Sequence, residues 1–488
     1  MSGRAVLRTA ALAAGVLLAC WVTVVLHWRG AGIEPTAGHI VLYLVLLPLA
    51  VLALVLLLRL AWRRFRGARA AAPPVAGIAA TADGEAPVDS GPQPDRVLHL
   101  LAGAVWLRAG DQPLAVAQAL AQPQRPPLHA TLKDALGLPV LAAEVADADP
   151  AMIVPALESV LAAAGTHEPV ERLFGEEALR ALALLDPVAE ELLYTALPAP
   201  SDNDVAEPEH GGLHPHAMHH SRSARAAAPG PRAPVLQVRV LLPAQWPVQA
   251  RTACVDWLQR KALAIGFDAG ALTVEAMPVA SAAEAWRLLD PATGVVHDDG
   301  DRHLLLAAHS LVGEAAIARL DAARELLADG HPEGRIPGEG AAGVLLSAAA
   351  PTIPADIPTI RLHRVLHARA GHGRAASREA ATLLQAALDT AGHAVDDIAL
   401  VFSDADHRPS RAIEVAGAIA AALPQIEPVD HARHLGLACG DLGAVAPLAL
   451  LATAAAQARA DHTPVLALSM ADRAARSAFV LSPQPAPA

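Results

Sequence analysis

Three side chains in the body of this sequence are candidate nucleophiles: the hydroxyl of Ser281 and the thiols of Cys254 and Cys439. Ser281 opens an amphipathic segment, and Glu284 follows at the spacing of a capping box. No histidine precedes Ser281 to act as its base, so we expect it to cap a helix. Cys254 falls on the apolar face of a helical segment and Cys439 in a glycine-rich loop, so we expect both thiols to pack in the core.

Histidines gather in two places, and imidazoles close in sequence could share a metal ion. The first group is His363, His367 and His372, in a segment that is typical of a strand leaving into a loop, so these side chains have no common face. The second group lies in an alanine- and proline-rich stretch without a rigid frame, where a solvated loop is expected; its members are His210, His214, His216, His219 and His220. We therefore predict no metal site and no cofactor.

Charge and motifs exclude several classes of function. The sequence has no GxxxxGK[ST], HExxH or GxSxG motif, and its only lysines are Lys133 and Lys261, so little is available to cradle phosphates. The first seventy residues hold eight arginines against Glu34, which leaves 29 basic and 48 acidic residues elsewhere, a net charge of −19. Phosphate backbones repel such an acidic body, so nucleic acid is not an expected partner.

Two apolar segments near the N-terminus, Thr9–Leu26 and Ile40–Leu58, are each long enough to cross a bilayer core of about 30 Å. Arginines precede the first and follow the second, whereas the loop between them carries only Arg29. The positive-inside rule then predicts a hairpin in the lipid bilayer with both termini and the body in the cytoplasm. Two alternatives are a cleaved secretory signal, which the second span would still arrest, and a lipoprotein signal ending at Cys20.

Composition divides the chain into a hairpin (1–66), a linker (67–95), an N-terminal half (96–200), a His/Pro/Ala-rich linker (201–234) and a C-terminal half (235–488). In the C-terminal half, aliphatic segments typical of strands alternate with amphipathic segments typical of helices, which predicts an α/β fold. The expected strands are 236–242, 271–276, 303–308, 343–347, 397–402 and 464–469. The expected helices are 250–265, 281–289, 314–327, 377–391, 411–423 and 448–460.

Two glycine-containing segments resemble the thiolase-like condensing enzymes of the β-ketoacyl synthase class. Residues 304–347 run through a strand and a helix into a Gly-Glu-Gly-Ala turn formed by Gly338, Glu339, Gly340 and Ala341, where glycine permits close backbone approach. Residues 437–458 are similar to the Gly-His-x-x-Gly-Ala loop and core helix of that class. The resemblance covers 97–482 and implies a layered αβαβα architecture.

The same resemblance implies a cysteine and two catalytic histidines, and this sequence has none of them in place. The helix expected to carry the cysteine begins at Ser281, and the second histidine position holds Asp441. A carboxylate cannot donate to an oxyanion unless it is protonated. We therefore expect no enzyme activity and a degenerate site or binding surface, formed by Asp404, Asp406, His407, Gly440, Asp441 and Gly443.

The segments 125–128 (RPPL), 138–141 (LPVL) and 335–342 (RIPGEGAA), taken with the hairpin and the acidic body, resemble the type VI lipase adaptor family of Gram-negative bacteria. That resemblance implies a non-catalytic adaptor in the bacterial inner membrane, which binds a lipase effector and helps to load it onto a VgrG-type spike protein. The fold also implies a homodimer. The alternatives are a divergent condensing or acyl-transfer enzyme that uses Ser281, Cys254 or Cys439, and a membrane scaffold that binds acyl carriers.

Overall fold

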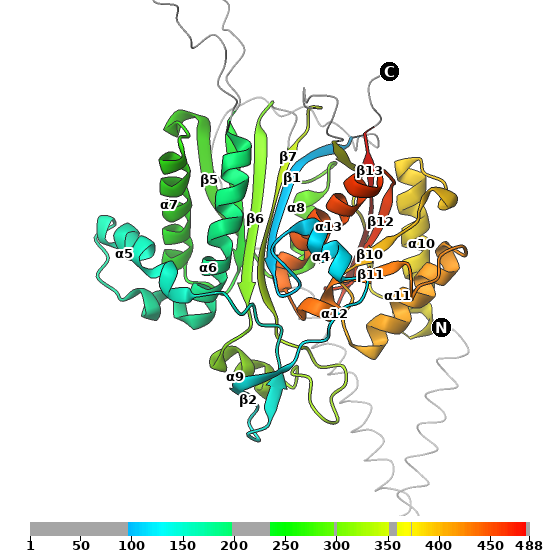
Figure 1. Cartoon of the computed structure of the whole chain (residues 1–488), viewed down its shortest axis with the longest axis horizontal. Coiled ribbons are helices and arrows are strands. Elements are labelled where there is room, and N and C mark those ends of the chain that lie inside the picture. Colours follow the sequence, from blue (N-terminus) through cyan, green and yellow to red (C-terminus); the bar gives the residue numbers. More distant parts are fainter. Residues whose placement is uncertain (1–95, 198–234, 297–299, 351–358, 372, 485–488) are drawn as a thin grey trace, which may run out of the picture. The chain divides into compact units, whose positions relative to one another are not determined.

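A computed structural model describes residues 96–197, 235–296, 300–350, 359–371 and 373–484 (Figure 1). The predicted spans 9–26 and 40–58 and both predicted linkers lie outside these residues. Among the described residues, no helix combines the length and the apolar character that a membrane span requires. The inner-membrane location predicted above therefore finds no support in the part of the chain that the structure describes. The longest described helical segment, Val170–Ala196, is interrupted by a kink at Gly175 and carries charged residues on both sides of it.

A mixed sheet of eleven strands runs through the described residues. Its order is β11-β10-β12-β13-β8-β1-β7-β6-β4-β5, with β9 paired to β13. A separate pair, β2 (Leu128–Lys133) and β3 (Pro139–Leu141), lies outside it. The strands of the large sheet are β1 (Leu98–Leu107), β4 (Leu236–Pro243), β5 (Leu272–Val279), β6 (Arg302–Ser310), β7 (Glu339–Ser347), β8 (Ile360–Leu362), β9 (Leu366–Arg369), β10 (Val401–Ser403), β11 (Ala432–His434), β12 (Val465–Ser469) and β13 (Ala475–Pro483).

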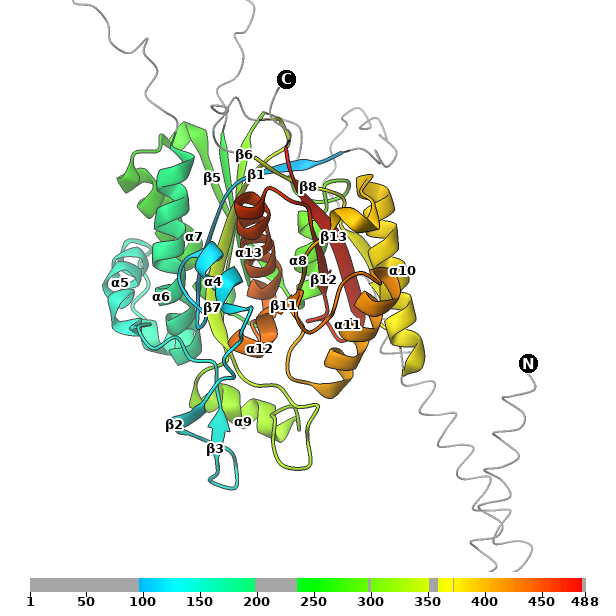
Figure 2. The ribbon, with the colours of Figure 1, turned by 45° about the vertical axis from the view of Figure 1, so that its right-hand side comes forward.

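Helices cover both outer faces of the sheet, and further helices lie between the two halves of the strand order (Figures 1 and 2). On one side α6 packs on β6 and β7, while on the other α10 packs on β12 and β13. Between them α13 contacts strands of both ends and also α8. The helices are α4 (Pro113–Ala119), α5 (Val154–Ala163), α6 (Val170–Ala196), α7 (Val248–Ile265), α8 (Ala282–Leu289), α9 (Glu314–Ala322), α10 (Arg374–Ala391), α11 (Pro409–Ala422), α12 (Leu435–Cys439) and α13 (Ala446–Asp461).

The central helix α13 explains the alanine-rich composition of the chain. It is buried on almost every side, and small residues let it approach the sheet closely. Gly103 of β1 lies so near that a Cβ atom there would be 2.9 Å from the Cβ of Ala452. A helix buried on all sides can position a loop at its N-terminus rigidly, and the candidate site includes that loop.

The predicted α/β layers are confirmed, and most predicted elements differ from the observed ones only at their ends. Two predictions were too long. The expected helix 314–327 ends at Ala322, because the chain turns at Arg324, where φ is 55°. The expected strand 397–402 is a short 3-10 turn followed by β10, which begins at Val401. In both cases the apolar residues continue past the end of the element, so periodicity alone misplaced the boundary.

Candidate functional site

A cavity of about 300 Å³ brings together several residues singled out from the sequence, although they are far apart along the chain. Ser281 enters it from the start of α8, and Asp441 and Gly443 from the loop before α13. Three arginines, Arg335, Arg408 and Arg473, contribute to its polar wall. Arg473 belongs to the segment 471–474 between β12 and β13, which lines the cavity, and Ala280 and Ala282 flank Ser281.

Ser281 caps α8, as the sequence predicts. Its Oγ accepts a hydrogen bond from the Glu284 backbone N–H at 3.4 Å. The Glu284 carboxylate reaches back to the backbone N–H of Ala280 at 2.6 Å, one residue before the usual capping-box position. The hydroxyl therefore lies at the positive end of a helix dipole and also lines the cavity.

Asp441 forms an ion pair inside this cavity. Its Oδ2 accepts from Nη1 of Arg335 at 2.9 Å, and its Oδ1 accepts from the Gly443 backbone N–H at 3.0 Å. Burial would raise the pKa of Asp441, but the charge and hydrogen bond of Arg335 and the Gly443 N–H outweigh it, so the pKa is lowered. Arg335 also pairs with Glu325. The Asp441 carboxylate is therefore ionised at neutral pH, at the position where the sequence resemblance predicts an imidazole.

The loop after β10 contributes a second ion pair. Both carboxylate oxygens of Asp406 accept from Arg408, at 2.9 Å from Nε and 2.7 Å from Nη2. This pair is more than nine-tenths buried, and the pKa of Arg408 is raised, because hydrogen bonding and the charge of Asp406 outweigh desolvation by burial. His407 is partly buried next to the pair, and burial lowers its pKa. Of residues 406–408, only Arg408 lines the 300 Å³ cavity.

Asp404 has a structural role at the end of β10. Its carboxylate accepts from Ser469 Oγ at 2.5 Å, from the Ala471 N–H at 3.0 Å and from the Met470 N–H. Burial raises the pKa of Asp404, and these hydrogen bonds oppose that shift. The residue ties the end of β10 to the turn that lines the cavity, and it does not line the cavity itself.

Glycines allow the turn before β7 to lie against the loop before α13. A Cβ at Gly338 would be 2.2 Å from the carbonyl oxygen of Cys439, and Gly440 has a φ of +64° and equally close neighbours. Between them the Asp441 N–H donates to the Ile336 carbonyl at 2.9 Å. The Gly-Glu-Gly turn found in the sequence therefore places Arg335 beside Asp441.

Glu339 is the first residue of β7, so the predicted turn at 338–341 is an extended strand start, and the Glu339 side chain is fully buried and paired. Its carboxylate accepts from Arg180 at 2.5 Å and 2.9 Å and from Ser310 Oγ at 2.8 Å. The Val145 N–H donates to it at 2.9 Å. These bonds join α6, β6 and β7 beneath the turn, so Glu339 supports the site without lining it. A Cβ at Gly340 would be 2.4 Å from Leu107 Cδ2, which shows how tightly β1 packs there.

The two thiols are unsuited to nucleophilic chemistry in this structure. Cys254 in α7 and Cys439 at the end of α12 are fully buried. Burial raises the pKa of Cys254 to about 12 and that of Cys439 to about 11. Neither residue lines the cavity, which leaves Ser281 as the nucleophile candidate that does.

The sequence analysis missed the cavity arginines. Arg335 stands in the quoted segment RIPGEGAA and Arg408 in the loop VFSDADHRPSRAIE, so both were in view. The signal that could have found them is that a carboxylate at a buried position, such as Asp406 or Asp441, needs a cation beside it. The arrangement can bind and polarise an anionic or carbonyl oxygen through the two guanidiniums, with the Ser281 hydroxyl in the same cavity.

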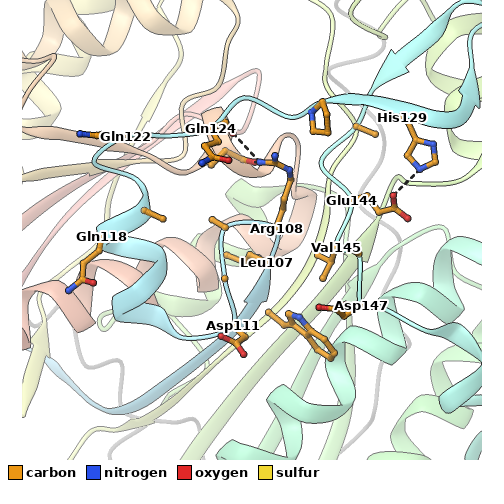
Figure 3. Close-up of a pocket in the computed structure, with 18 of the residues that line it drawn as sticks. Leu107, Arg108, Asp111, Gln118, Gln122, Gln124, His129, Glu144, Val145 and Asp147 are labelled. Carbon is orange, nitrogen blue, oxygen red and sulfur yellow. Dashed lines mark hydrogen bonds and ion pairs between the residues drawn. The ribbon is translucent and has the colours of Figure 1, made fainter.

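The largest described cavity lies elsewhere and contains none of the candidate residues. It measures about 1140 Å³ and lies around the end of β1, α4 and the segments near β2 and β3 (Figure 3). Arg108 donates from Nη1 to the carbonyls of Gln124 at 3.0 Å and Ala438 at 3.1 Å. His129 Nε2 lies 3.0 Å from the Glu144 carboxylate. The basic side chains Arg108 and His129 of this cavity therefore already have partners within the chain.

Metal-ligating residues do not gather in the part of the chain that the structure describes. His363 and His367 instead interact with the hydroxyls of Ser482 and Ser477, at 2.8 Å and 2.9 Å. His372 and the group 210–220 lie outside the described residues. His363 is thus a buried polar residue of the sheet, whereas His367 is exposed on β9.

Comparisons with known proteins find relatives by structure alone, since no family model and no curated protein matches the sequence. A ketosynthase of a type II polyketide synthase, solved with its acyl-carrier protein and a bound hexaketide, is similar with a TM-score of 0.50 and 11% identity over 80% of this chain and 100% of that one. The ishigamide ketosynthase/chain length factor has a TM-score of 0.47 and 14% identity, covering 80% and 100%. An oxazolomycin ketosynthase domain of Streptomyces albus has a TM-score of 0.48 and 12% identity, covering 81% and 75%.

These comparisons correct one prediction and confirm another. The expectation that the chain is not an enzyme is not upheld, because the solved structure that it matches at a TM-score of 0.50 is a condensing enzyme of the same fold. The expectation rested on the replaced residues alone and overlooked the serine and the three arginines that line the cavity. No type VI secretion protein is among the structures named here. At these identities the likeness concerns the fold, and the chain has the fold of the thiolase-like condensing enzymes.

Proposed function

We propose that this protein is a divergent acyl-transfer enzyme of the condensing-enzyme fold, with Ser281 as the acyl acceptor. The observation that carries the proposal is the shared cavity of Ser281, Arg335 and Arg408. A nucleophile at a helix N-terminus gains from the helix dipole, and guanidiniums stabilise negative charge that develops on a carbonyl oxygen.

The reaction balances without a redox partner. Oγ of Ser281 attacks the carbonyl carbon of a thioester, a carbon–oxygen bond forms, and the carbon–sulfur bond breaks. The serine proton passes to the departing thiolate, which leaves as a free thiol. Arg335 and Arg408 each keep a carboxylate partner and have further N–H groups for the substrate oxygen. The products are an acyl-serine ester and a thiol.

The cavity also indicates the class of substrate. About 300 Å³ is at the small end of the range for ligand sites, which favours a short acyl chain. An acyl carrier is a fitting donor, since the ketosynthase of similar fold was solved with its acyl-carrier protein. Binding of an acyl carrier was also among the alternatives drawn from the sequence.

Intact-protein mass spectrometry tests this function directly. The full chain is incubated with acetyl- and butyryl-N-acetylcysteamine, and the acyl adduct is located by peptide mapping. Ser281→Asn keeps a residue that caps helices well but removes the hydroxyl, so it should abolish the adduct. Ser281→Thr keeps both properties and should retain part of it. No adduct in the wild-type protein, or an adduct that persists in Ser281→Asn, would overturn the proposal.

Delivery of a lipase effector to a VgrG-type spike protein remains a prediction from the sequence resemblance, and so does the homodimer. No feature of the described residues favours either over acyl transfer. Co-purification of the tagged full chain with a co-expressed lipase, resolved by size-exclusion chromatography, tests the first. The mass of the protein alone, measured by light scattering, tests the second.

A further inference from the structure

A second cavity, of about 880 Å³, lies where the first turns of α10 and α11 face the turn between β12 and β13. Four arginines line it: Arg408, Arg411, Arg473 and Arg476. Two of them, Arg408 and Arg473, also line the cavity of Ser281, so the two spaces are neighbours. Guanidiniums of like charge repel one another, and such a group is stable only with anions to balance it.

Three of these arginines have a carboxylate partner within the chain. Arg408 pairs with Asp406, and Arg473 pairs with Glu325 at 2.7 Å. Arg476 binds Glu414 through two bonds, at 2.7 Å and 2.9 Å. Their charges are therefore already balanced by residues of this protein.

Arg411 is the one of these four arginines that has no hydrogen-bonded carboxylate partner among the described residues. It is only 6% exposed, yet it makes a single side-chain hydrogen bond among the described residues, from Nη2 to the Asp472 carbonyl at 3.0 Å. Its Nη1 is buried and has no hydrogen-bond partner there. Burial, followed by the charges of Arg476 and Arg408, lowers the pKa of Arg411 to about 10, while the nearby carboxylates of Glu414 and Asp404 oppose this shift without forming a hydrogen bond to Arg411. A buried cation without a bound anion is costly, so this position favours an external one.

Two carboxylates of the chain line this cavity: Glu414, which binds Arg476, and Glu333. Glu333 accepts from the Ser410 backbone N–H at 2.9 Å and from the Ser410 hydroxyl, at the first turn of α11. This exposed side chain lies on the loop before β7 and is not paired with Arg411. Its position shows that the start of α11 attracts oxyanions while leaving the buried guanidinium unsatisfied.

We propose that this cavity binds the oxyanion of a phosphate- or carboxylate-bearing small molecule, with Arg411 as its buried anchor and Arg473 as a more exposed second contact. Arg411 offers a planar pair of N–H donors that suits either group. The inference does not depend on acyl transfer by Ser281, because its readout is the binding of an anion.

The test is isothermal titration of the full chain with inorganic phosphate and, separately, with succinate, at constant ionic strength set with sodium chloride. We expect saturable binding of at least one of them. Arg411→Gln should weaken it about tenfold or more, because a hydrogen bond to a charged group is lost. Arg378→Gln, an exposed position on α10, should leave the affinity unchanged. Phosphate binding alone would assign a phosphate ligand, and succinate binding alone a carboxylate ligand.

Thermal unfolding guards against a variant that merely fails to fold. Without added anion, Arg411→Gln should melt at the same temperature as the wild type or higher, because a buried charge is removed, and phosphate or succinate should no longer raise its melting temperature. Arg473→Gln, whose side chain is 58% exposed, should fold normally and weaken binding severalfold. Absence of saturable binding of both anions, or equal affinity in all three variants, would overturn the proposal.

Discussion

The guanidinium of Arg335 lies 2.9 Å from the carboxylate of Asp441, and this pair joins the turn before β7 to the loop before α13. The two residues are 106 positions apart in the chain. Their pairing explains how a carboxylate can occupy a buried position at which the related enzyme class has an imidazole. Each half of the pair requires the other, since an isolated buried charge is destabilising.

The first prediction concerns this pair. Arg335→Met should lower the free energy of unfolding by about 3 kcal/mol, because the Asp441 carboxylate would be left without its cation. Asp441→Asn should cost only about 1 kcal/mol, since the amide oxygen can still accept from Gly443. Urea denaturation measures both. The control is Arg319→Met, whose side chain is 60% exposed and 3.6 Å from Glu177, and which should change stability by less than about 0.5 kcal/mol. Equal losses for Arg335→Met and Arg319→Met would contradict a pair that stabilises the site.

The second prediction concerns acid sensitivity. Burial, followed by the charges of Arg361 and His393, lowers the pKa of His363 to about 4. The unfolded chain takes up a proton on this ring near pH 6.5, whereas the folded protein does so only near pH 4. Above pH 6.5 the ring is neutral in both states and does not change the free energy of unfolding. As the pH drops from 6.5 to 4, protonation of the ring in the unfolded chain should lower the free energy of unfolding by up to about 3 kcal/mol.

Substitution separates this histidine from the others. His363→Gln should reduce the fall in stability between pH 6.5 and 4, because glutamine does not titrate, and part of the fall should remain because burial also lowers the pKa of His434 to about 4. The exposed His331→Gln should leave the curve unchanged. Urea denaturation at half-unit pH steps is the measurement. A wild-type slope that survives in His363→Gln would assign the pH dependence to other groups.

The third prediction concerns the backbone of the site. Gly443 has a φ of +53°, and a Cβ there would be 2.8 Å from Cδ2 of His309. Gly443→Ala should therefore lose about 3 kcal/mol, from the left-handed backbone and the collision together. Gly137→Ala provides the matched control, because its φ is +80° but nothing lies within 4 Å, and it should lose about 1 kcal/mol. Equal thermal shifts for the two variants would show that the His309 ring gives way easily.

The fourth prediction concerns the thiols. Because Cys254 and Cys439 are buried and their pKa values are raised, neither should react with Ellman's reagent in the native protein at pH 8. Both should react after unfolding in guanidinium chloride. A Cys20→Ser background removes the remaining cysteine. Release of one equivalent of thionitrobenzoate from the native protein within minutes would return a cysteine to the list of candidate nucleophiles.

Local chemistry accounts for the part of the site that sequence reasoning found. Ser281 with Glu284 predicts a helix start, and Ser281 does cap α8. The glycines at 338 and 340 predict close backbone approach, and both are tightly packed. Apolar periodicity also predicts the strands and helices, because the pattern of each element is set within a few neighbouring residues. That the three catalytic positions have lost their cysteine and histidines stays a prediction, which considers each position without its neighbours in space.

The sequence by itself determined the α/β layers, the capping serine, the acidic balance and the absence of the expected cysteine and histidines. The tertiary structure alone decided that Arg335 faces Asp441, that Arg408 shares a cavity with Ser281, and that the buried Nη1 of Arg411 has no hydrogen-bond partner among the described residues. The physical reason is distance along the chain. Periodicity and capping act over a few residues, whereas the balance of buried charge is set by groups that only folding brings together.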